Sequence, residues 1–298
     1  MEGTLPWVAR ELPTPGSLDL WLLRVSDVPA GILDEAVLDA TERQRAAALM
    51  HDADRTRFTA AHVALRRLLG SYLRVRPEEI HFGRDTCPCC GGPHGRPTVL
   101  GAARDLFFSL SHRGDLALVG TAMVPIGVDV DLVSDATATA ELSSMLHVAE
   151  QEELAALAPA LRPRALARLW TRKEAYLKGL GSGLGRDPSL DYVGSGAPGG
   201  PYPPSGWTLL EVPVDRGYAA AVAVRGELTL TVPTVTRLSG LEVAGLTCAA
   251  PLSETSSSLL TRGPTPLGRA PTSRRPGASA PAPRAPGTSP LLTGGTPT

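Results

Sequence analysis

The order of strand-like and helix-like segments constrains this chain most, because the same order occurs twice. Apolar residues recur every second position in strands and about every 3.6 positions in helices. In the first block, strand patterns at 18–25, 79–82, 106–111 and 116–123 surround helical patterns at 41–50 and 52–73. In the second, strand patterns at 126–133, 207–212, 217–224 and 228–232 surround helical patterns at 138–157 and 163–179. The sequence therefore predicts an α+β protein made of two similar halves, residues 1–124 and 125–240.

The end of the chain has a different composition. Residues 241–298 are rich in Pro, Ser, Thr and Gly, contain no aromatic residue and show no sustained periodicity. Such a segment buries too little apolar surface to offset the entropy lost on ordering. We predict a disordered tail.

Charge and hydropathy exclude some classes of function. The net charge of −1 gives no indication of a nucleic-acid partner. No apolar run reaches the roughly 20 residues that a membrane-spanning helix needs. The first residues lack the basic start and apolar core of a signal peptide. We expect a cytoplasmic protein without a membrane partner.

Two aspartates alternate with valines at residues 127–131. Successive side chains of a strand point to opposite faces, so Asp129 and Asp131 share one face. Two carboxylates on one face repel each other unless a cation lies between them. Mg²⁺ takes oxygen ligands and commonly binds one or two carboxylates together with phosphate oxygens. The pattern leaves two interpretations, a magnesium site or a solvated acidic edge strand.

The two lysines of the chain, Lys173 and Lys178, both fall in the helical segment 170–178. Glu174 and Lys178 are four residues apart and share a helix face. An ordinary surface ion pair is one interpretation. The other is functional, because a lysine is a compact charge suited to phosphate and Glu174 could act as a metal ligand or a base.

Two further segments carry candidate phosphate ligands. Ser111 and His112 end a strand pattern at a predicted hairpin turn, where they could contact a phosphate, form a Ser/His nucleophilic pair or have no role. The absence of a G-x-S-x-G element disfavours the nucleophilic pair. In the loop at 93–97, Gly95 would let the backbone approach a ligand closely, and Arg96 offers a planar donor fork.

The loop at 87–96 contains three cysteines, Cys87, Cys89 and Cys90, followed by His94. Read as C-x-C-C with no second pair, this cluster favours reduced thiols over a structural zinc site. Metal analysis would separate the two interpretations.

Five elements, taken together and in this order, resemble those of the Sfp-type 4′-phosphopantetheinyl transferases. They lie at residues 94–97, 109–113, 127–131, 146–150 and 170–178, and the last is the most specific. Three positions depart from the family pattern. Arg113 replaces a serine, Leu146 replaces a phenylalanine, and Asp131 is shorter than the glutamate often found there.

The resemblance implies a fold and a set of site residues. The fold would be two α/β halves with pseudo-two-fold symmetry and coenzyme A bound between them. Asp129, Asp131 and Glu174 would bind Mg²⁺. Contacts to coenzyme A would come from Arg43, Arg57, Gly95, Arg96, Pro97, Ser111, His112 and Lys178.

The reaction implied is that of a holo-[acyl-carrier-protein] synthase. A serine of an apo acyl or peptidyl carrier protein would attack the β-phosphate of coenzyme A, with release of 3′,5′-ADP. Lys178 would stabilise the charge on the leaving group. Glu174, directly or through a metal-bound water, would accept the serine proton, and Glu150 is the second candidate base. The enzyme would act as a monomer in a pathway such as polyketide or non-ribosomal peptide biosynthesis.

Two alternatives stay open. One is a non-catalytic module on the same fold that binds coenzyme A or a carrier protein. The other concerns the arginines along the segment 162–172, which form either a docking face for an acidic carrier protein or a solvated helix face. These are Arg162, Arg164, Arg168 and Arg172.

Overall fold

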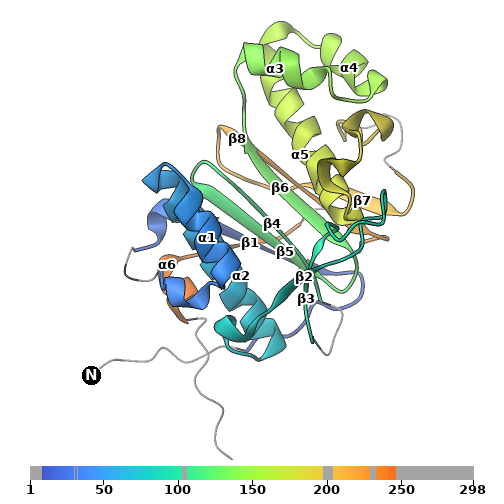
Figure 1. Ribbon diagram of the computed structural model, residues 1–298. Helices are drawn as coiled ribbons and strands as arrows, with labels where there is room; N and C mark the ends of the chain where they lie inside the picture. Colours follow the sequence, from blue (N-terminus) through green and yellow to red (C-terminus); the bar gives the residue numbers. More distant parts are fainter. Residues whose placement is uncertain are drawn as a thin grey trace, which may run out of the picture. The chain divides into compact units, whose positions relative to one another are not determined.

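Figure 1 shows a computed structural model of the chain. The structure describes residues 9–29, 31, 33–102, 106–196, 204–228 and 233–245. The predicted tail lies outside these residues from position 246 onward, as do residues 229–232 of the last predicted strand. No helix in the described ranges is both long enough and apolar enough to cross a membrane.

The first sheet has four strands in the order β4-β5-β1-β9. Their bounds are β4 Phe107–Arg113, β5 Leu116–Ala122, β1 Leu18–Arg24 and β9 Val235–Leu238. Strand β5 runs antiparallel to both β4 and β1, whereas β9 is parallel to β1. Three helices belong to this part of the chain, α1 Ala40–Ala48, α2 Asp52–Leu73 and the short α6 Gly240–Gly245.

The second sheet has three antiparallel strands in the order β6-β8-β7. They are β6 Ile126–Leu132, β8 Tyr218–Arg225 and β7 Trp207–Glu211. The long helix α5, Arg162–Leu180, covers one face of this sheet. Helices α3, Ala136–Ser143, and α4, Val148–Ala155, pack near the beginning of α5 through a cluster that includes Leu154 and Leu166.

The two sheets pack against each other and leave their long helices on the outside (Figure 1). Leu20 and Leu22 of β1 meet Val128 and Val130 of β6 in the central core. Trp21 belongs instead to the core beneath α2. Strand β1 is therefore apolar on both faces, as expected for a strand with packed layers on both sides.

Strands β4 and β6 are the facing edges of the two sheets, and serine side chains join them. The backbone N–H groups of Val128 and Val130 donate to the hydroxyls of Ser109, at 3.0 Å, and Ser111, at 3.3 Å. These hydroxyls satisfy edge N–H groups that would otherwise be unpaired. The alternating serines of the 109–113 element thus fix β4 beside the aspartate strand.

The mixed α+β class is confirmed, and several element assignments differ from the prediction. A 3₁₀ turn at Pro77–Glu79 replaces the predicted strand start, and β2, Phe82–Arg84, pairs instead with β3, Pro97–Val99. The single helical pattern at 138–157 forms two helices. Strand β9 was not predicted, and it returns the chain to the first sheet.

Candidate active site

The buried carboxylate of Asp129 lies at the centre of the candidate site. Its Oδ1 accepts hydrogen bonds from the Ser111 hydroxyl at 2.7 Å and from the Lys178 ammonium at 2.6 Å. The Lys178 Nζ also lies 3.3 Å from the backbone oxygen of Val128. Residues from β4, β6 and α5 therefore meet at one carboxylate.

Asp131 and Glu174 complete an acidic group around this point. Asp131 pairs with Arg113, with 3.0 Å between Nε and Oδ1. Burial, with the nearby charges of Asp129 and Asp131, raises the pKa of Glu174, although Lys178 opposes the shift. The charges of Asp129 and Asp131 thus reach Glu174, and carboxylate oxygens are the ligands that Mg²⁺ prefers.

Two glycines allow the helix that carries Glu174 to approach the aspartate strand. A Cβ added at Gly127 would lie 2.0 Å from the backbone oxygen of Ala175 and 2.4 Å from the nitrogen of Gly179. A Cβ at Gly179 would lie 2.6 Å from the Trp207 ring. Larger residues would push α5 away from β6 and separate the carboxylates, so the glycine of the 127–131 element has a packing role.

His112 lies on strand β4, and the prediction that it occupies the turn was wrong because β4 continues to Arg113. Its Nδ1 is buried and has no hydrogen-bond partner within the described part of the chain. Burial and the positive charges of His62, Arg57 and Lys178 lower the pKa of His112 to about 4. An unpaired ring nitrogen beside cationic groups fits a bound anion.

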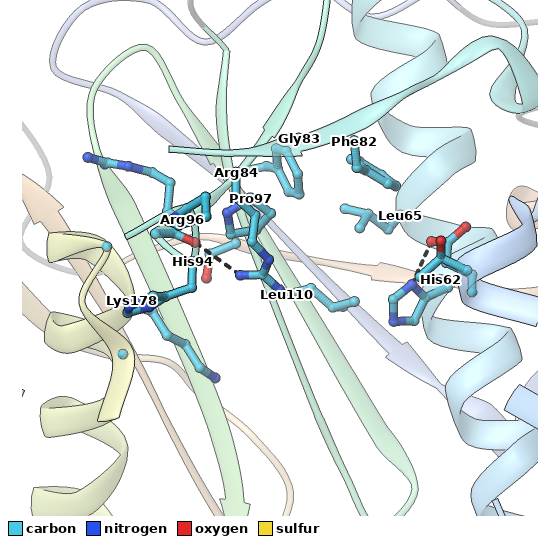
Figure 2. A pocket seen from close by; sticks show the side chains of 18 of the residues that line it. His62, Leu65, Phe82, Gly83, Arg84, His94, Arg96, Pro97, Leu110 and Lys178 are labelled. Carbon is cyan, nitrogen blue, oxygen red and sulfur yellow. Dashed lines mark hydrogen bonds and ion pairs between the residues drawn. The ribbon is translucent and has the colours of Figure 1, made fainter. Parts of the chain in front are cut away.

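A cavity of about 590 Å³ extends from Lys178 toward helix α2 (Figure 2). Lys178 and Arg96 lie at one end and His62 at the other, with Leu110 between them. The basic and histidine side chains that line it are Arg45, His62, Arg84, His94, Arg96 and Lys178. Phe82, Leu65 and other apolar side chains also line it, together with the carboxylates Asp39 and Glu42. The apolar and basic parts of the lining suit a ligand with both a flat ring and phosphates.

Arg96 is fixed at the cavity wall by three contacts. Its Nε donates to Asp85 Oδ2 at 2.9 Å, one terminal nitrogen donates to the Gly179 oxygen at 3.2 Å, and its guanidinium lies 5.2 Å from the Phe107 ring centroid. The adjacent Gly95 is buried, and an added Cβ would lie 2.5 Å from the Asp85 oxygen. Gly95, Arg96 and Pro97 all line the cavity, where we predicted them to meet a ligand.

Comparisons with known proteins identify the family of the chain. Residues 125–221 match a family model described as the 4′-phosphopantetheinyl transferase superfamily. The chain is 31% identical over 229 residues to the 4′-phosphopantetheinyl transferase HetI of Nostoc sp., and the alignment covers 72% of this chain and 93% of HetI. This chain belongs to the 4′-phosphopantetheinyl transferase superfamily. It is also 28% identical over 180 residues to AcpT of Salmonella typhi, which spans 60% of this chain and 83% of AcpT. A 4′-phosphopantetheinyl transferase of Bacillus subtilis is 24% identical over 149 residues, covering 50% of this chain and 62% of the relative.

Two predicted arginines of this transferase-family chain do not line the cavity. Arg43 is exposed and donates to the backbone oxygen of Leu38. Arg57 donates to the Gly114 oxygen and pairs with Asp54 at 2.7 Å. Its positive charge contributes to the lowered pKa of His112. Arg45, which we did not predict, lines the cavity. It was overlooked because it lies in a polar helix without a motif of its own.

Glu150, the second candidate base, is placed by the structure in a fully buried network. Its carboxylate pairs with Lys173 at 2.8 Å and accepts backbone N–H groups of Val193 at 2.8 Å and Gly194 at 3.2 Å. It also accepts a hydrogen bond, at 3.1 Å, from the backbone N–H of His147, the N-cap residue of helix α4. These surroundings favour a structural role in joining α4, α5 and the 193–194 loop.

The arginines of α5 do not form one exposed basic face. Arg172 is buried and donates to the backbone oxygens of Gly194, Val193 and Leu209. Arg168 pairs with Glu211 at 2.7 Å, and Arg162 donates to backbone oxygens at the end of α4 and beyond it. The four arginines therefore do not form one continuous exposed face, because Arg172 is buried, whereas Arg164 and Arg168 are exposed.

Proposed function

We propose that this protein transfers the 4′-phosphopantetheine group of coenzyme A to a serine of an apo acyl or peptidyl carrier protein. The observation that carries the proposal is the arrangement around Asp129. Lys178 lines one end of the cavity and pairs with Asp129, and the charges of Asp129 and Asp131 act on Glu174, in a chain of the 4′-phosphopantetheinyl transferase superfamily. The cytoplasmic location and the monomeric state expected from the sequence stay predictions.

The residues that would hold Mg²⁺ are Asp129, Asp131 and Glu174. The repulsion that Asp129 and Asp131 exert on Glu174 supports this assignment, because a divalent cation would relieve it. When bound, Mg²⁺ supplies positive charge that neutralises pyrophosphate oxygens and stabilises the leaving group.

Residues that line the cavity or lie beside it would position the donor; Ser111 and His112 lie outside its lining. Lys178 and the free Nδ1 edge of His112 would meet pyrophosphate oxygens, with Ser111 beside them. Gly95, Arg96 and Pro97 would form the wall for the adenine ring. At the far end, Arg45 would meet the 3′-phosphate, whereas Arg43 and Arg57 are less well placed because neither lines the cavity.

The transfer step needs a base for the serine hydroxyl. The serine oxygen forms a bond to the β-phosphorus, the bond from that phosphorus to the bridging oxygen breaks, and 3′,5′-ADP leaves. Glu174 accepts the hydroxyl proton in this scheme, directly or through a water. Glu150 would hold Lys173 in place instead of transferring a proton.

Intact-mass spectrometry of a carrier protein tests the proposal. An apo acyl carrier protein and an apo peptidyl carrier protein are each incubated with the protein, coenzyme A and Mg²⁺. The expected result is a gain of one phosphopantetheine unit that EDTA prevents and excess Mg²⁺ restores. Binding of coenzyme A without any mass gain on either carrier would favour the non-catalytic module.

A further inference from the structure

The loop between β2 and β3 forms a tight turn around three potential metal ligands. The backbone N–H of Gly91 donates to the oxygen of Cys87 at 2.9 Å, and the N–H of Cys87 donates to the oxygen of Gly92 at 2.8 Å. Gly91 has a φ of +74°, which favours glycine. These bonds bring Cys90 back over Cys87, two cysteines separated by two residues.

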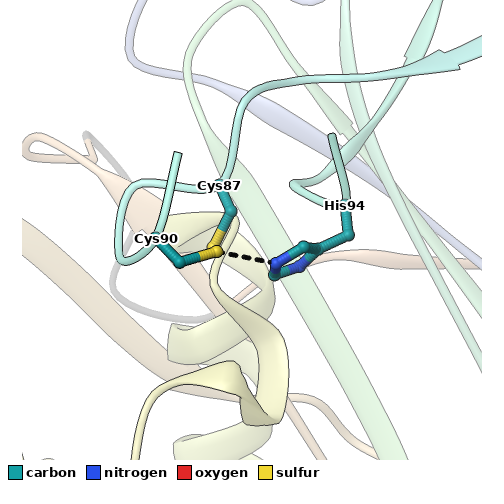
Figure 3. A group of neighbouring side chains, drawn as sticks. All are labelled: Cys87, Cys90 and His94. Atoms are coloured by element: carbon teal, nitrogen blue, oxygen red, sulfur yellow. Dashed lines mark hydrogen bonds between the residues drawn. The ribbon is translucent and has the colours of Figure 1, made fainter. Parts of the chain in front are cut away.

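The sulfur atoms of this turn point toward one imidazole (Figure 3). One ligand atom each from Cys87, Cys90 and His94 lies within 4.8 Å of the other two, and Cys90 Sγ is 2.9 Å from His94 Nε2. Ligand atoms of a tetrahedral zinc site lie about 3.4–3.8 Å apart, as Zn–S and Zn–N bond lengths require. Small side-chain rotations would convert the observed cluster into that geometry.

A backbone N–H group near the cluster favours the thiolate form of cysteine, which is the form that binds a metal. The N–H of Gly92 lies 3.4 Å from Cys90 Sγ and donates to it. Such a donor stabilises a thiolate. A Cβ at Gly92 would lie 3.0 Å from the His94 ring and 3.4 Å from Cys90 Sγ, so this position also suits glycine.

We propose that Cys87, Cys90 and His94 bind a zinc ion, with its fourth coordination position open to solvent. Two thiolates and an imidazole are ligands that zinc prefers, whereas Mg²⁺ prefers oxygen. Cys90 and His94 are exposed, which leaves the fourth position accessible to water. The fourth cysteine, Cys248, lies outside the described residues.

The cluster lies next to the cavity wall, so a bound metal would affect that wall. His94 directly precedes Gly95, Arg96 and Pro97, and all four residues line the cavity. A Cβ at Gly185 would lie 3.7 Å from the His94 ring, so the loop after α5 is also near. A zinc ion would tie the outer part of the loop together and hold this cavity wall in place.

Zinc content of the untagged full chain tests the proposal, and this measurement does not depend on transferase activity. The protein is loaded with Zn²⁺, passed through gel filtration in excess Mg²⁺, and analysed by mass spectrometry of the metals. We expect about one zinc per chain for the wild type. Cys90→Ser and His94→Gln replace exposed side chains, and each should lose nearly all of this zinc while keeping the wild-type circular dichroism spectrum.

Two matched variants separate this cluster from other sites. Cys89→Ser changes a thiol of the same loop that lies outside the cluster, and Asp129→Asn changes the carboxylate site. Both should retain the zinc. Substitution by Co²⁺ should give the visible absorption bands of tetrahedral cobalt with thiolate ligands in the wild type, and Cys90→Ser should lack them. A wild-type zinc content no higher than that of Cys90→Ser, or equal loss in Cys89→Ser, would overturn the proposal.

Discussion

The two lysines of the chain, Lys173 and Lys178, lie five residues apart on α5 and have opposite surroundings. Lys173 is fully buried, pairs with Glu150 at 2.8 Å and donates to the backbone oxygen of Asp191. Lys178 keeps 30% of its side chain exposed and pairs with Asp129 at 2.6 Å at the edge of the cavity. Five residues turn a helix by about 140° beyond a full rotation, so the two ammonium groups leave opposite sides of α5.

The segment 170–178 thus contains one lysine in a buried network and one lysine at the proposed site. Burial lowers the pKa of Lys173, and the charge of Glu150 opposes that shift. The Lys173–Glu150 pair thus holds α4 and the 193–194 loop against α5. The Lys178–Asp129 pair instead leaves one charged group facing the cavity. Variants at the two pairs should separate loss of stability from loss of activity.

The largest effect should follow from removing a carboxylate near Lys178. Asp129→Ala and Glu174→Ala should each lower the rate of transfer at least about 10³-fold, or about 4 kcal/mol of transition-state stabilisation. Asp135→Asn and Glu152→Gln change exposed carboxylates and should keep near wild-type rates. Initial rates of carrier modification measure this, and substantial activity in either alanine variant would remove Asp129 or Glu174 from the site.

The next largest effect is expected in the free energy of unfolding of the two lysine variants, measured with denaturant. Lys173→Met should lower the free energy of unfolding by about 3–5 kcal/mol, because it leaves Glu150 buried without a cation. Lys178→Met should lower it less, since its site is partly solvated, yet should abolish transfer.

A double variant checks the cause of this loss. Lys173→Met combined with Glu150→Gln should be more stable than Lys173→Met alone, because no unpaired charge remains. Equal losses for Lys173→Met and Lys178→Met would contradict the division between the two lysines.

A smaller effect should appear in the pH dependence of stability. Since the pKa of His112 is lowered to about 4 in the folded protein, protons bind the unfolded state preferentially between pH 6.5 and 4. The wild type should therefore lose up to about 3 kcal/mol of stability as pH falls through this window. His112→Gln should lose less over the same range, whereas His81→Gln, at an exposed position, should behave as the wild type. Parallel curves for His112→Gln and the wild type would refute the assignment.

The smallest effect is expected for Arg113, the last residue of β4, which pairs with Asp131. Its side chain is 61% exposed where it pairs with Asp131, so Arg113→Ser should change the free energy of unfolding by less than about 1 kcal/mol. Transfer rates should also stay within about tenfold of the wild type. A much larger loss of rate with unchanged stability would show that Arg113 contacts the donor.

Local periodicity predicted the part of the site that lies on regular elements. Alternation in a strand placed Asp129 and Asp131 on one face, and helical spacing placed Glu174 and Lys178 together. The close packing at Gly127 explains why these two faces meet. That contact is a tertiary one, and the sequence indicated it only through the family resemblance.

The remaining features depend on contacts between distant segments. Nothing near Glu150 indicated that it would pair with Lys173, because the pair forms only when α4 folds back onto α5. The pairing of β9 with β1 and the position of Arg45 at the cavity also depend on contacts between segments that are distant in the sequence. In the cysteine loop, reading the run as C-x-C-C hid the pair Cys87 and Cys90, which the turn brings together with His94.

The most direct test of the central claim is intact-mass spectrometry of an apo carrier protein treated with coenzyme A and Mg²⁺. Wild-type protein and Lys178→Met are compared at equal concentration, after circular dichroism has shown that both are folded. A gain of one phosphopantetheine unit is expected with the wild type, and none with Lys178→Met over the same time. An equal gain with both proteins would contradict the assignment of Lys178, and no gain with the wild type on either carrier class would contradict the transferase function itself.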